Sequence, residues 1–348
     1  MKQLHVGVLF GGSSTEHEVS RRSAATILRS ISGKYKKTPI GITKEGKWYA
    51  YFGEEALIAG GEWETSDEKY EIFFSSSEIL YKKDGTLLPL NIDVAFPVLH
   101  GKFGEDGTVQ GLFEMLGIPY VGCGVGASAN AMDKSMTKLL VSTAGIRQAD
   151  FVLVDRHNRH NLDALITESE TRLGYPVFVK PCRSGSSVGV VKAADRATLR
   201  AGLESALTYD DRILIEEAID ARELECAVLS VGDEPVAEVG EVISALEYYD
   251  YEAKYNNPTS RTETAPDIPK ETENEIREKA VRIFRLLDCR GLSRVDFFLD
   301  RKSGEVVFNE INTLPGFTSI SMYPMLIEKH GINRETLVEK LIEEALHK

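Results

Sequence analysis

The stretch VVFNEINTLPGF, Val306 to Phe317, joins an apolar run typical of a buried β-strand to a polar end. The strand must stop at Pro315 and Gly316, because this pair is typical of a tight turn. Side chains alternate faces along a strand, so Glu310 and Asn312 point to the same side. A buried strand has little use for such polar groups unless a charged ligand lies beside them.

A second apolar stretch, SRVDFF, places Asp296 on a strand that can run beside the first. Two carboxylates and an amide oxygen on one face form the hard oxygen site that Mg²⁺ prefers, especially when substrate phosphates complete its octahedron. A solvated edge strand is the competing interpretation. The apolar neighbours of Asp296, Glu310 and Asn312 indicate burial, and a buried unpaired carboxylate is costly. The sequence therefore favours a metal site.

A second motif, FVKPCRSGSSVGV, places Lys180 at a strand end, followed by serines and glycines at 184–189. Small residues let backbone N–H groups approach phosphate oxygens, and lysine adds a positive charge. The spacing matches neither the P-loop nor the dinucleotide-binding fingerprint, and a flexible hairpin turn fits the composition equally well. Lys134 and Lys254 are further candidate cations, which favours phosphate binding.

Two glutamates follow another apolar strand. Glu216 lies near the end of ILIEE, and Glu223 comes seven residues later. Such side chains can accept hydrogen bonds from ribose hydroxyls or the adenine amine. From the residues alone, however, plain surface charge is the preferred interpretation.

The composition is that of a globular protein with more than one domain. The chain has 348 residues, of which 42% are hydrophobic and 27% charged, with a net charge of −13. This charge argues against general binding to nucleic acid or anionic membranes but allows a local basic pocket. Four distant cysteines without a CxxC motif favour reduced thiols over zinc or disulfides. No targeting signal and no run of roughly 18 apolar residues is evident, so a cytoplasmic location is expected.

Strands and helices alternate in the first part of the chain. We expect strands at HVGVLFGG, KTPIGIT, IDVAFPVLHG and IPYVGCG, and helices at STEHEVSRRSAATILRSI, behind a Ser or Thr cap, and at EDGTVQGLFEMLG. This alternation predicts an open parallel α/β sheet, although residues 52–90 carry few signals. SANAMDKSMTKLLVSTAG predicts one helix, and long strands follow. LEYYDYEAKYNNPTSRTETAPD interrupts them as a long loop of the kind that is often functional.

Lys134 with FVKPCRSGSSVGV, ILIEE, SRVDFF and NEINTLPGFT resembles the ATP-grasp superfamily. FGGSSTEHEVS, LHGKFGEDGTVQG and YYDYEAKY narrow the resemblance to the D-alanine–D-alanine ligase family, over residues 4–345. The resemblance implies a three-domain α/β ATP-grasp fold, with an N-terminal parallel α/β domain at 1–121, a central domain at 122–215 and a C-terminal catalytic domain at 216–348. It also implies ATP-dependent ligation of two D-alanines through an acyl phosphate, for peptidoglycan precursors, by a cytoplasmic homodimer.

The resemblance implies a role for each residue of the nucleotide and metal site. The ligands of two Mg²⁺ ions, which Mn²⁺ can replace, are Asp296, Glu310 and Asn312. The phosphate-binding lysines are Lys134, Lys180 and Lys254. The residues around adenine and ribose are Glu216, Ala218, Ile219 and Glu223.

The first D-alanine has its own set of residues in the resemblance. Its ammonium meets Glu16, which is linked through Ser186 to Tyr255 in the long loop. This linkage closes the loop as a lid and excludes water from the acyl phosphate. His100 resembles the histidine near the first substrate's carboxylate, and a structural core histidine is the alternative.

The second D-alanine is expected to bind by its carboxylate to Ser321 and the backbone near Met322. In the resemblance, Arg294 and the Gly316 N–H hold the oxyanion of the tetrahedral intermediate, which is charge stabilisation by fixed donors. The proton acceptor for the attacking amine is not assigned.

Relatives in this family form D-alanyl-D-lactate or D-alanyl-D-serine instead. The lid motif YYDYEAKY keeps the pattern of dipeptide-forming members and disfavours D-lactate, and Met322 is typical of D-alanine-specific enzymes. Residues 256–263 depart from the usual continuation, so D-serine stays the main alternative. Another carboxylate–amine ligase is disfavoured by Glu16, His100 and the lid tyrosine. A non-catalytic nucleotide-binding module is disfavoured because the acidic trio is complete.

Overall fold

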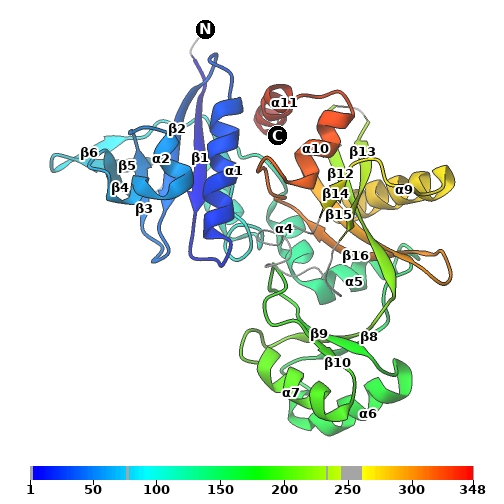
Figure 1. Ribbon diagram of the computed structural model, residues 1–348. Helices are drawn as coiled ribbons and strands as arrows, with labels where there is room; N and C mark the ends of the chain where they lie inside the picture. Colours follow the sequence, from blue (N-terminus) through cyan, green and yellow to red (C-terminus); the bar gives the residue numbers. More distant parts are fainter. Residues whose placement is uncertain (1–2, 76–77, 233, 244–260, 348) are drawn as a thin grey trace.

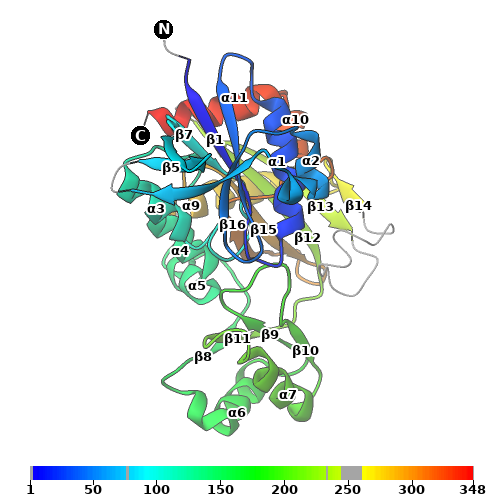
Figure 2. The same ribbon diagram turned by 90° about the vertical axis from the view of Figure 1, so that its left-hand side faces the viewer.

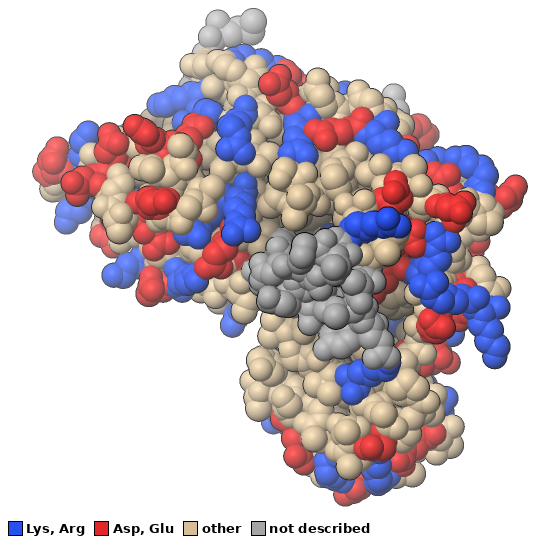
Figure 3. Space-filling model, in the orientation of Figure 1, with Lys and Arg blue, Asp and Glu red and all other residues tan. Residues whose placement is uncertain are grey.

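The computed structural model describes residues 3–75, 78–232, 234–243 and 261–347. Three β-sheets follow one another along the chain, each with its own helices (Figure 1). The first and third sheets lie beside each other near the chain ends, and the second projects away from both (Figures 1 and 2). Over the face in Figure 3, basic and acidic side chains are interspersed.

The first sheet is built around β1 (His5–Gly11), which pairs in parallel with β2 (Lys36–Ile42) and β7 (Val94–Pro97). All seven residues of β1 are buried, as expected for a parallel strand covered on both faces. Helix α1 (His17–Ser30) packs on β1, and α3 (Thr108–Leu116) ends at a glycine in the left-handed conformation. The predicted parallel core is confirmed.

The stretch that carried few signals adds three antiparallel strands, and β3 directly before it adds a fourth, so the sheet is mixed rather than purely parallel. These strands are β3 (Trp48–Tyr51), β4 (Lys69–Phe74), β5 (Ile79–Lys83) and β6 (Thr86–Pro89). The short helices α2 (Ala56–Gly60) and η1 (Glu62–Thr65) precede β4. Asp84 and Gly85 take φ of 49° and 80° between β5 and β6. Asp-Gly is a strong hairpin signal, and it was available in the sequence.

Two smaller expectations are wrong. IPYVGCG forms no named strand and pairs only through one bridge, Ala95 with Tyr120. Helix α1 has Glu16 at its N-cap position without a side-chain cap bond, rather than a capping Ser or Thr. The hydroxyl of Ser14 instead donates to the His100 carbonyl at 2.7 Å. The Glu16 carboxylate makes no capping bond and is therefore available for contacts outside helix α1.

The second sheet is antiparallel in the order β10-β9-β11-β8. Its strands are β8 (Phe151–Val154), β9 (Val177–Pro181), β10 (Val191–Ala193) and β11 (Ile213–Glu217). Helices α6 (Leu162–Arg172), preceded by η2 (Arg159–Asn161), and α7 (Arg196–Ala206) cover one face of it (Figure 1). A capping box between Asp195 and Thr198 starts α7.

The third sheet is antiparallel in the order β14-β13-β12-β15-β16. Its strands are β12 (Ala221–Ser230), β13 (Val236–Ile243), β14 (Arg261–Glu263), β15 (Gly291–Asp300) and β16 (Val306–Asn312). The helices are α9 (Lys270–Leu286), α10 (Met322–Lys329) and α11 (Arg334–Leu346). Buried residues of α9 pack on one face, while α10 and α11 share a core with the other face and the first sheet.

The predicted single helix after Gly122 is two helices, α4 (Val125–Met132) and α5 (Lys134–Ser142). The chain breaks at Asp133, whose carboxylate accepts hydrogen bonds from the N–H groups of Ser135 and Met136. Aspartate is a strong N-cap, so it starts a new helix here. Lys134 thereby becomes the first residue of α5. Buried residues of both helices share a core with α9, and the domain boundaries stay a prediction.

No helix in the described ranges is both long and apolar enough to cross a membrane.

Candidate active site

A cavity of about 530 Å³ lies between the second and third sheets. Its walls come from the loop after β9, the connection from β11 to β12, the end of α4, and strands β12, β15 and β16. The lining includes these residues selected from the sequence: Glu16, Lys134, Lys180, Ser186, Glu216, Ala218, Ile219, Glu223, Arg294, Asp296, Glu310 and Asn312. Lys254 and Tyr255 lie outside the described residues. The structure thus gathers elements from three sheets at one cavity.

Three carboxylates form a row across the third sheet. In the strand register, Asp296 on β15 lies opposite Glu225 on β12 and Glu310 on β16. A register shift follows Asp296, so Asn309 is the extra residue of a β-bulge. Bulges re-aim side chains, which explains why the sequence neighbours Asn309 and Glu310 both line the cavity. The sequence analysis missed Glu225. Its spacing of two residues from Glu223 was an available signal, because residues two apart in a strand lie on the same face.

We call Glu225, Asp296 and Glu310 the acidic row, and Arg294 lies beside it, two residues before Asp296 on β15. Its Nε and Nη2 donate to the two oxygens of Asp296 at 2.8 and 2.7 Å. Its Nε also lies 3.2 Å from Oε2 of Glu225. Asn312 Nδ2 donates to Asp296 at 3.1 Å. Both Asp296 oxygens are therefore engaged by protein donors.

The acidic row fits a divalent cation in its chemistry. Burial raises the pKa of Asp296 to about 7, against the opposing effect of Arg294, and Glu225 and Glu310 add to the rise. Crowded buried carboxylates of this kind are relieved by a cation, and carboxylate and amide oxygens suit Mg²⁺. Within the described ranges, no three His, Cys, Asp or Glu side chains converge on a ready-made metal position. A metal held here must take its remaining ligands from Asn312, substrate or water.

Lys134 connects the acidic row to the loop after β9. Its Nζ donates to the Ser184 carbonyl at 3.0 Å and lies 3.4 Å from Oε2 of Glu310. Burial opposes the charge of Lys134, but Glu310 outweighs it and holds the pKa of the lysine above its ordinary value. A fixed cation thus stands between the loop and the carboxylates.

Glu216 is a buried counter-ion for two lysines rather than surface charge. Its oxygens lie 3.0 Å from Lys138 Nζ and 2.6 Å from Lys180 Nζ. Burial by itself raises the pKa of Glu216, but the two lysines outweigh it and hold the pKa at about 2. Lys138, which the sequence analysis missed, also donates to the Ala149 carbonyl at 3.1 Å. Its position four residues after Lys134 in a helix was an available signal, because such residues share a face.

The loop after β9 connects β9 to β10, and the two strands pair as an antiparallel hairpin. The hairpin interpretation is therefore correct for this connection. The loop also lines the cavity, as the phosphate-binding interpretation requires. Ser186 and Ser187 take φ of 49° and 57°. Such left-handed conformations are uncommon for residues other than glycine and cluster at functional sites.

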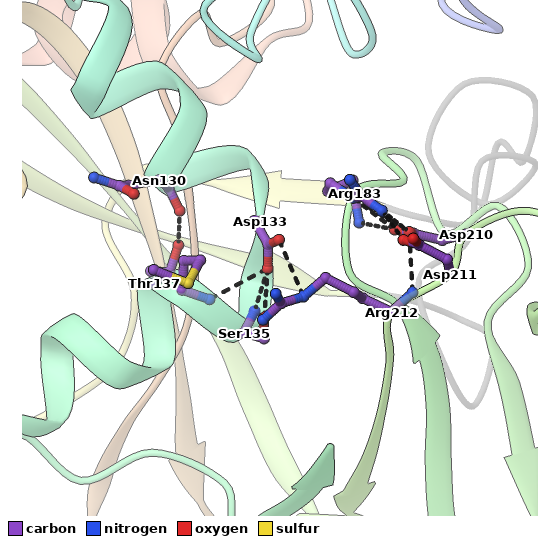
Figure 4. A network of polar contacts seen from close by, with 9 residues as sticks. Asn130, Asp133, Ser135, Thr137, Arg183, Asp210, Asp211 and Arg212 are labelled. Atoms are coloured by element: carbon purple, nitrogen blue, oxygen red, sulfur yellow. Dashed lines mark hydrogen bonds and ion pairs between the residues drawn. The ribbon is translucent and has the colours of Figure 1, made fainter. Parts of the chain in front are cut away.

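A charged network anchors the base of this loop (Figure 4). The backbone N–H of Arg183 donates to Asp210 Oδ2 at 2.7 Å, and the Arg183 guanidinium pairs with both Asp210 and Asp211. Arg212 Nε lies 3.5 Å from a carboxylate oxygen of Asp133, the cap of α5. The loop base and the helix that begins with Lys134 are therefore held by one network.

Glu16 reaches the same loop from the first sheet. A Cβ added to Gly101 or to Gly185 would lie 3.0 Å from Glu16 Oε2, so this oxygen lies close to both glycines. Nearby, the Glu105 carboxylate accepts hydrogen bonds from the N–H groups of Gly101 at 2.7 Å and Leu314 at 3.1 Å. Burial raises the pKa of Glu105 to about 7, and Glu16 adds to the rise. Glu105 lies in a motif used for the resemblance, but no role was assigned to it.

His100 is buried at the contact between the first sheet's loops and the loop after β16. Its Nδ1–H donates to the Leu314 carbonyl at 2.8 Å. Its Nε2 therefore accepts from Ser23 Oγ, 3.2 Å away, and that hydroxyl accepts from the Phe317 N–H at 3.1 Å. The chain positions His100 as a link between two units, and contact with substrate stays a prediction.

The residues assigned to the second substrate lie at the far end of this loop. Ser321 Oγ accepts from the Thr318 N–H at 3.0 Å, and a Cβ on Gly316 would lie 2.8 Å from that oxygen. Met322 is buried at the start of α10, where its sulfur would lie 2.6 Å from a Cβ on Gly240. Gly316, Ser321 and Met322 are not part of the cavity lining.

The fold and the cavity together define an ATP-grasp ligase. Family models described as D-ala D-ala ligase N-terminus and D-ala D-ala ligase C-terminus match residues 5–123 and 140–343. The D-alanine--D-alanine ligase of Clostridium novyi is 49% identical over 346 residues, covering 99% of this chain and 98% of that protein. That of Caldicellulosiruptor bescii is 48% identical, covering 100% and 96%. The chain belongs to the D-alanine–D-alanine ligase family.

Solved structures agree with this membership. The VanG D-Ala:D-Ser ligase from Enterococcus faecalis has a TM-score of 0.89 and 40% identity, covering 99% of this chain and 100% of that one. The D-alanine-D-alanine ligase from Coxiella burnetii has a TM-score of 0.85 and 32% identity, covering 100% and 95%. The predicted fold class is confirmed. The family further indicates that the enzyme uses ATP and a divalent metal ion on small-molecule substrates.

Proposed function

We propose that the protein joins two D-alanines into D-alanyl-D-alanine, with ATP converted to ADP and phosphate, for peptidoglycan precursor synthesis. The observation that carries the proposal is the cavity that Lys134 and Lys180 line together with the acidic row, with Lys134 3.4 Å from Glu310. The whole-chain identity to curated ligases supports the substrate. We further propose that the enzyme works in the cytoplasm as a homodimer.

ATP lies along this cavity in the proposal. Adenine and ribose lie against the connection from β11 to β12, where Ala218 and Ile219 line the cavity between Glu216 and Glu223. The phosphates extend toward Lys134, Lys180 and the loop after β9, whose N–H groups and hydroxyls are donors of the right kind. By resemblance, Lys254 adds a third cation.

Asp296, Glu310 and Asn312 would hold two Mg²⁺ ions, or Mn²⁺. The metal would supply charge neutralisation and orientation of the transferred phosphoryl group. Lys134 stays near Glu310 and adds its own charge at the phosphates. Because phosphoryl transfer depends on positioning and electrostatics, fixed charges on rigid strands are suited to it.

The first D-alanine lies between the first sheet's loops and the loop after β9. Glu16 holds its ammonium, and its carboxylate attacks the γ-phosphorus of ATP to form D-alanyl phosphate. His100 orients the substrate carboxylate. By resemblance, Ser186 and Tyr255 connect Glu16 to the lid, which excludes water from the acyl phosphate.

The second D-alanine binds by its carboxylate at Ser321 and the backbone of Met322. Its deprotonated amine attacks the acyl phosphate carbon, and phosphate leaves. Arg294 and the Gly316 N–H stabilise the oxyanion that forms at this carbon. Donors aimed at developing charge in a water-poor site are the largest single contribution in many such reactions.

Product analysis tests the proposal. Purified protein is incubated with ATP, Mg²⁺ and D-alanine, with and without competing D-serine or D-lactate, and the products are separated by mass. D-alanyl-D-alanine as the main product under competition is the expected result. A dominant mixed product would overturn the assignment in favour of D-serine, which the similarity to the VanG ligase makes the second candidate. Glu310→Gln should abolish product formation, and unchanged turnover would contradict its assignment.

A further inference from the structure

Arg294 and the proposed metal compete for the same carboxylate. Arg294 binds Asp296 through two hydrogen bonds of 2.8 and 2.7 Å, and Asn312 donates to Asp296 as well. Oδ2 of Asp296 accepts from both Arg294 Nη2 and Asn312 Nδ2, so a divalent cation at this oxygen must replace one of these donors. Where the replaced donor is Arg294, loading of the site includes an exchange of partners at Arg294.

A guanidinium that loses its partner here would be a buried uncompensated charge, because Arg294 is only 8% exposed. Such a charge is strongly destabilising. Glu225 is the other carboxylate paired with Arg294 within the described part of the chain, at 3.2 Å from Nε. It makes this contact already, so the exchange needs no large movement.

We propose that Glu225 is the positioning residue that retains Arg294 when a divalent cation takes Asp296. Arg294 exchanges its two-bond contact with Asp296 for Glu225 and keeps its place beside the cavity. This inference rests on the proposed function, which assigns Asp296 to the metal and Arg294 to the oxyanion. Glu225 then acts through Arg294 and touches no reacting atom.

The strand register explains why Glu225 is suited to this role. It lies opposite Asp296 on one side and opposite Gly240 on the other, so no side chain of β13 competes for its carboxylate. Met322 covers Gly240 with its sulfur, which closes this end of the acidic row with an apolar group. Glu225 is itself 7% exposed, so its charge is weakly screened. The row brings three carboxylates together with two basic side chains, Arg294 and Lys134, so acidic groups outnumber basic ones at the site.

The test compares Glu225→Gln, which removes the charge, with Glu225→Asp, which keeps it. The matched control is Glu238→Gln on β13. Glu238 has similar burial, at 8% exposed, and pairs with Arg277 at 2.8 Å, but does not line the cavity. Mn²⁺ binding in the presence of ADP is measured directly by electron paramagnetic resonance. Unfolding temperatures are recorded with and without Mg²⁺ and ADP, followed by kcat and KM.

Glu225→Gln should weaken Mn²⁺ binding about tenfold, in the range known for residues that support metal ligands. Its unfolding temperature without metal should stay near that of the wild type, because Asp296 still pairs with Arg294. The rise on adding Mg²⁺ and ADP should shrink. We expect kcat to fall more than the KM for D-alanine changes, Glu225→Asp to recover much of both effects, and Glu238→Gln to bind Mn²⁺ like the wild type.

Unchanged Mn²⁺ affinity in Glu225→Gln would overturn the inference. So would an equal loss of unfolding temperature with and without metal, since that indicates a purely structural role. The proposed function fails separately, if the wild-type protein forms no D-alanyl-D-alanine. If the wild type is active but Glu225→Gln binds Mn²⁺ like the wild type, this inference is wrong and the proposed function stands.

Discussion

The Nδ1–H of His100 donates to the carbonyl of Leu314 at 2.8 Å and so joins residues 214 positions apart in the chain. The Leu314 N–H donates to Glu105, so both backbone groups of Leu314 are bound by the first unit. The loop after β16, which carries the residues proposed for the second substrate, is thus held from outside its own sheet. Ser23, through the Phe317 N–H, adds a third bond.

Replacing His100 should disturb catalysis beyond its effect on stability. His100→Ala leaves the Leu314 carbonyl and the Ser23 hydroxyl without this partner, which costs about 1–3 kcal/mol of unfolding free energy. Because the held loop shifts, we expect kcat/KM for D-alanine to fall by roughly tenfold or more. Urea unfolding and steady-state kinetics measure the two effects.

His5 offers a matched control for this change. It is buried like His100, and its Nδ1 and Nε2 bond the Asn91 carbonyl at 2.6 Å and the Thr38 hydroxyl at 2.8 Å. His5→Ala should lose similar stability but keep the kinetic constants. If the two variants have the same kinetics, His100 is structural only.

The network at the loop base predicts unequal roles for two neighbouring aspartates. The Asp210 side chain is 3% exposed and accepts from the Arg183 backbone, whereas Asp211 is 49% exposed. Asp210→Asn should cost about 1–3 kcal/mol of unfolding free energy and raise the KM for ATP, because the loop base loosens. Asp211→Asn should stay within about 0.5 kcal/mol. An equal KM for ATP in Asp210→Asn and Asp211→Asn would contradict a role of Asp210 in holding the loop.

Glu216 should make stability depend on pH in the acid range. Its pKa falls from an ordinary 4.5 to about 2, because Lys138 and Lys180 outweigh burial. A carboxylate with a lowered pKa stabilises the fold above pH 4.5, and this contribution is lost as pH falls from 4.5 toward 2. Glu216→Gln should lose about 3 kcal/mol of unfolding free energy near neutral pH and flatten this dependence.

Urea unfolding at several pH values between 2.5 and 7 checks this prediction. Glu217→Gln is the control, because Glu217 is the next residue and pairs with Arg147 at a more exposed position. It should change stability by less than about 1 kcal/mol. A loss in Glu216→Gln that is the same at pH 2.5 and pH 7 would mean that the ion pairs do not set the acid sensitivity.

Gly185 lies beside the Glu16 carboxylate, so its replacement should affect D-alanine binding. A methyl group there would lie 3.0 Å from Glu16 Oε2, so Gly185→Ala should displace this carboxylate and raise the KM for D-alanine more than the KM for ATP. Gly126→Ala in α4 is the control, because nothing lies within 4 Å of its added Cβ. That change should be neutral or stabilising by up to about 1 kcal/mol. An unchanged KM for D-alanine in Gly185→Ala would contradict the proposed contact between Glu16 and the substrate ammonium.

Local patterns in the sequence predicted much of the site. The period of two in a strand placed Glu310 and Asn312 on one face, and the serines and glycines after Lys180 indicated the loop that lines the cavity. Local patterns failed where a single residue changed the backbone. Asp133 ended one helix and capped the next, and the Asp84–Gly85 turn belonged to an antiparallel extension that the parallel pattern did not predict.

The sequence by itself determined which strands carry charge, which loop can approach phosphate and which family the motifs resemble, because these depend on neighbours along the chain. Only the tertiary structure decided that Glu225, Asp296 and Glu310 lie in one row, since cross-strand register depends on strands far apart in sequence. It also decided that Lys138 shares Glu216 with Lys180. A buried charge must find its partner in space, and no spacing along the chain specifies that partner.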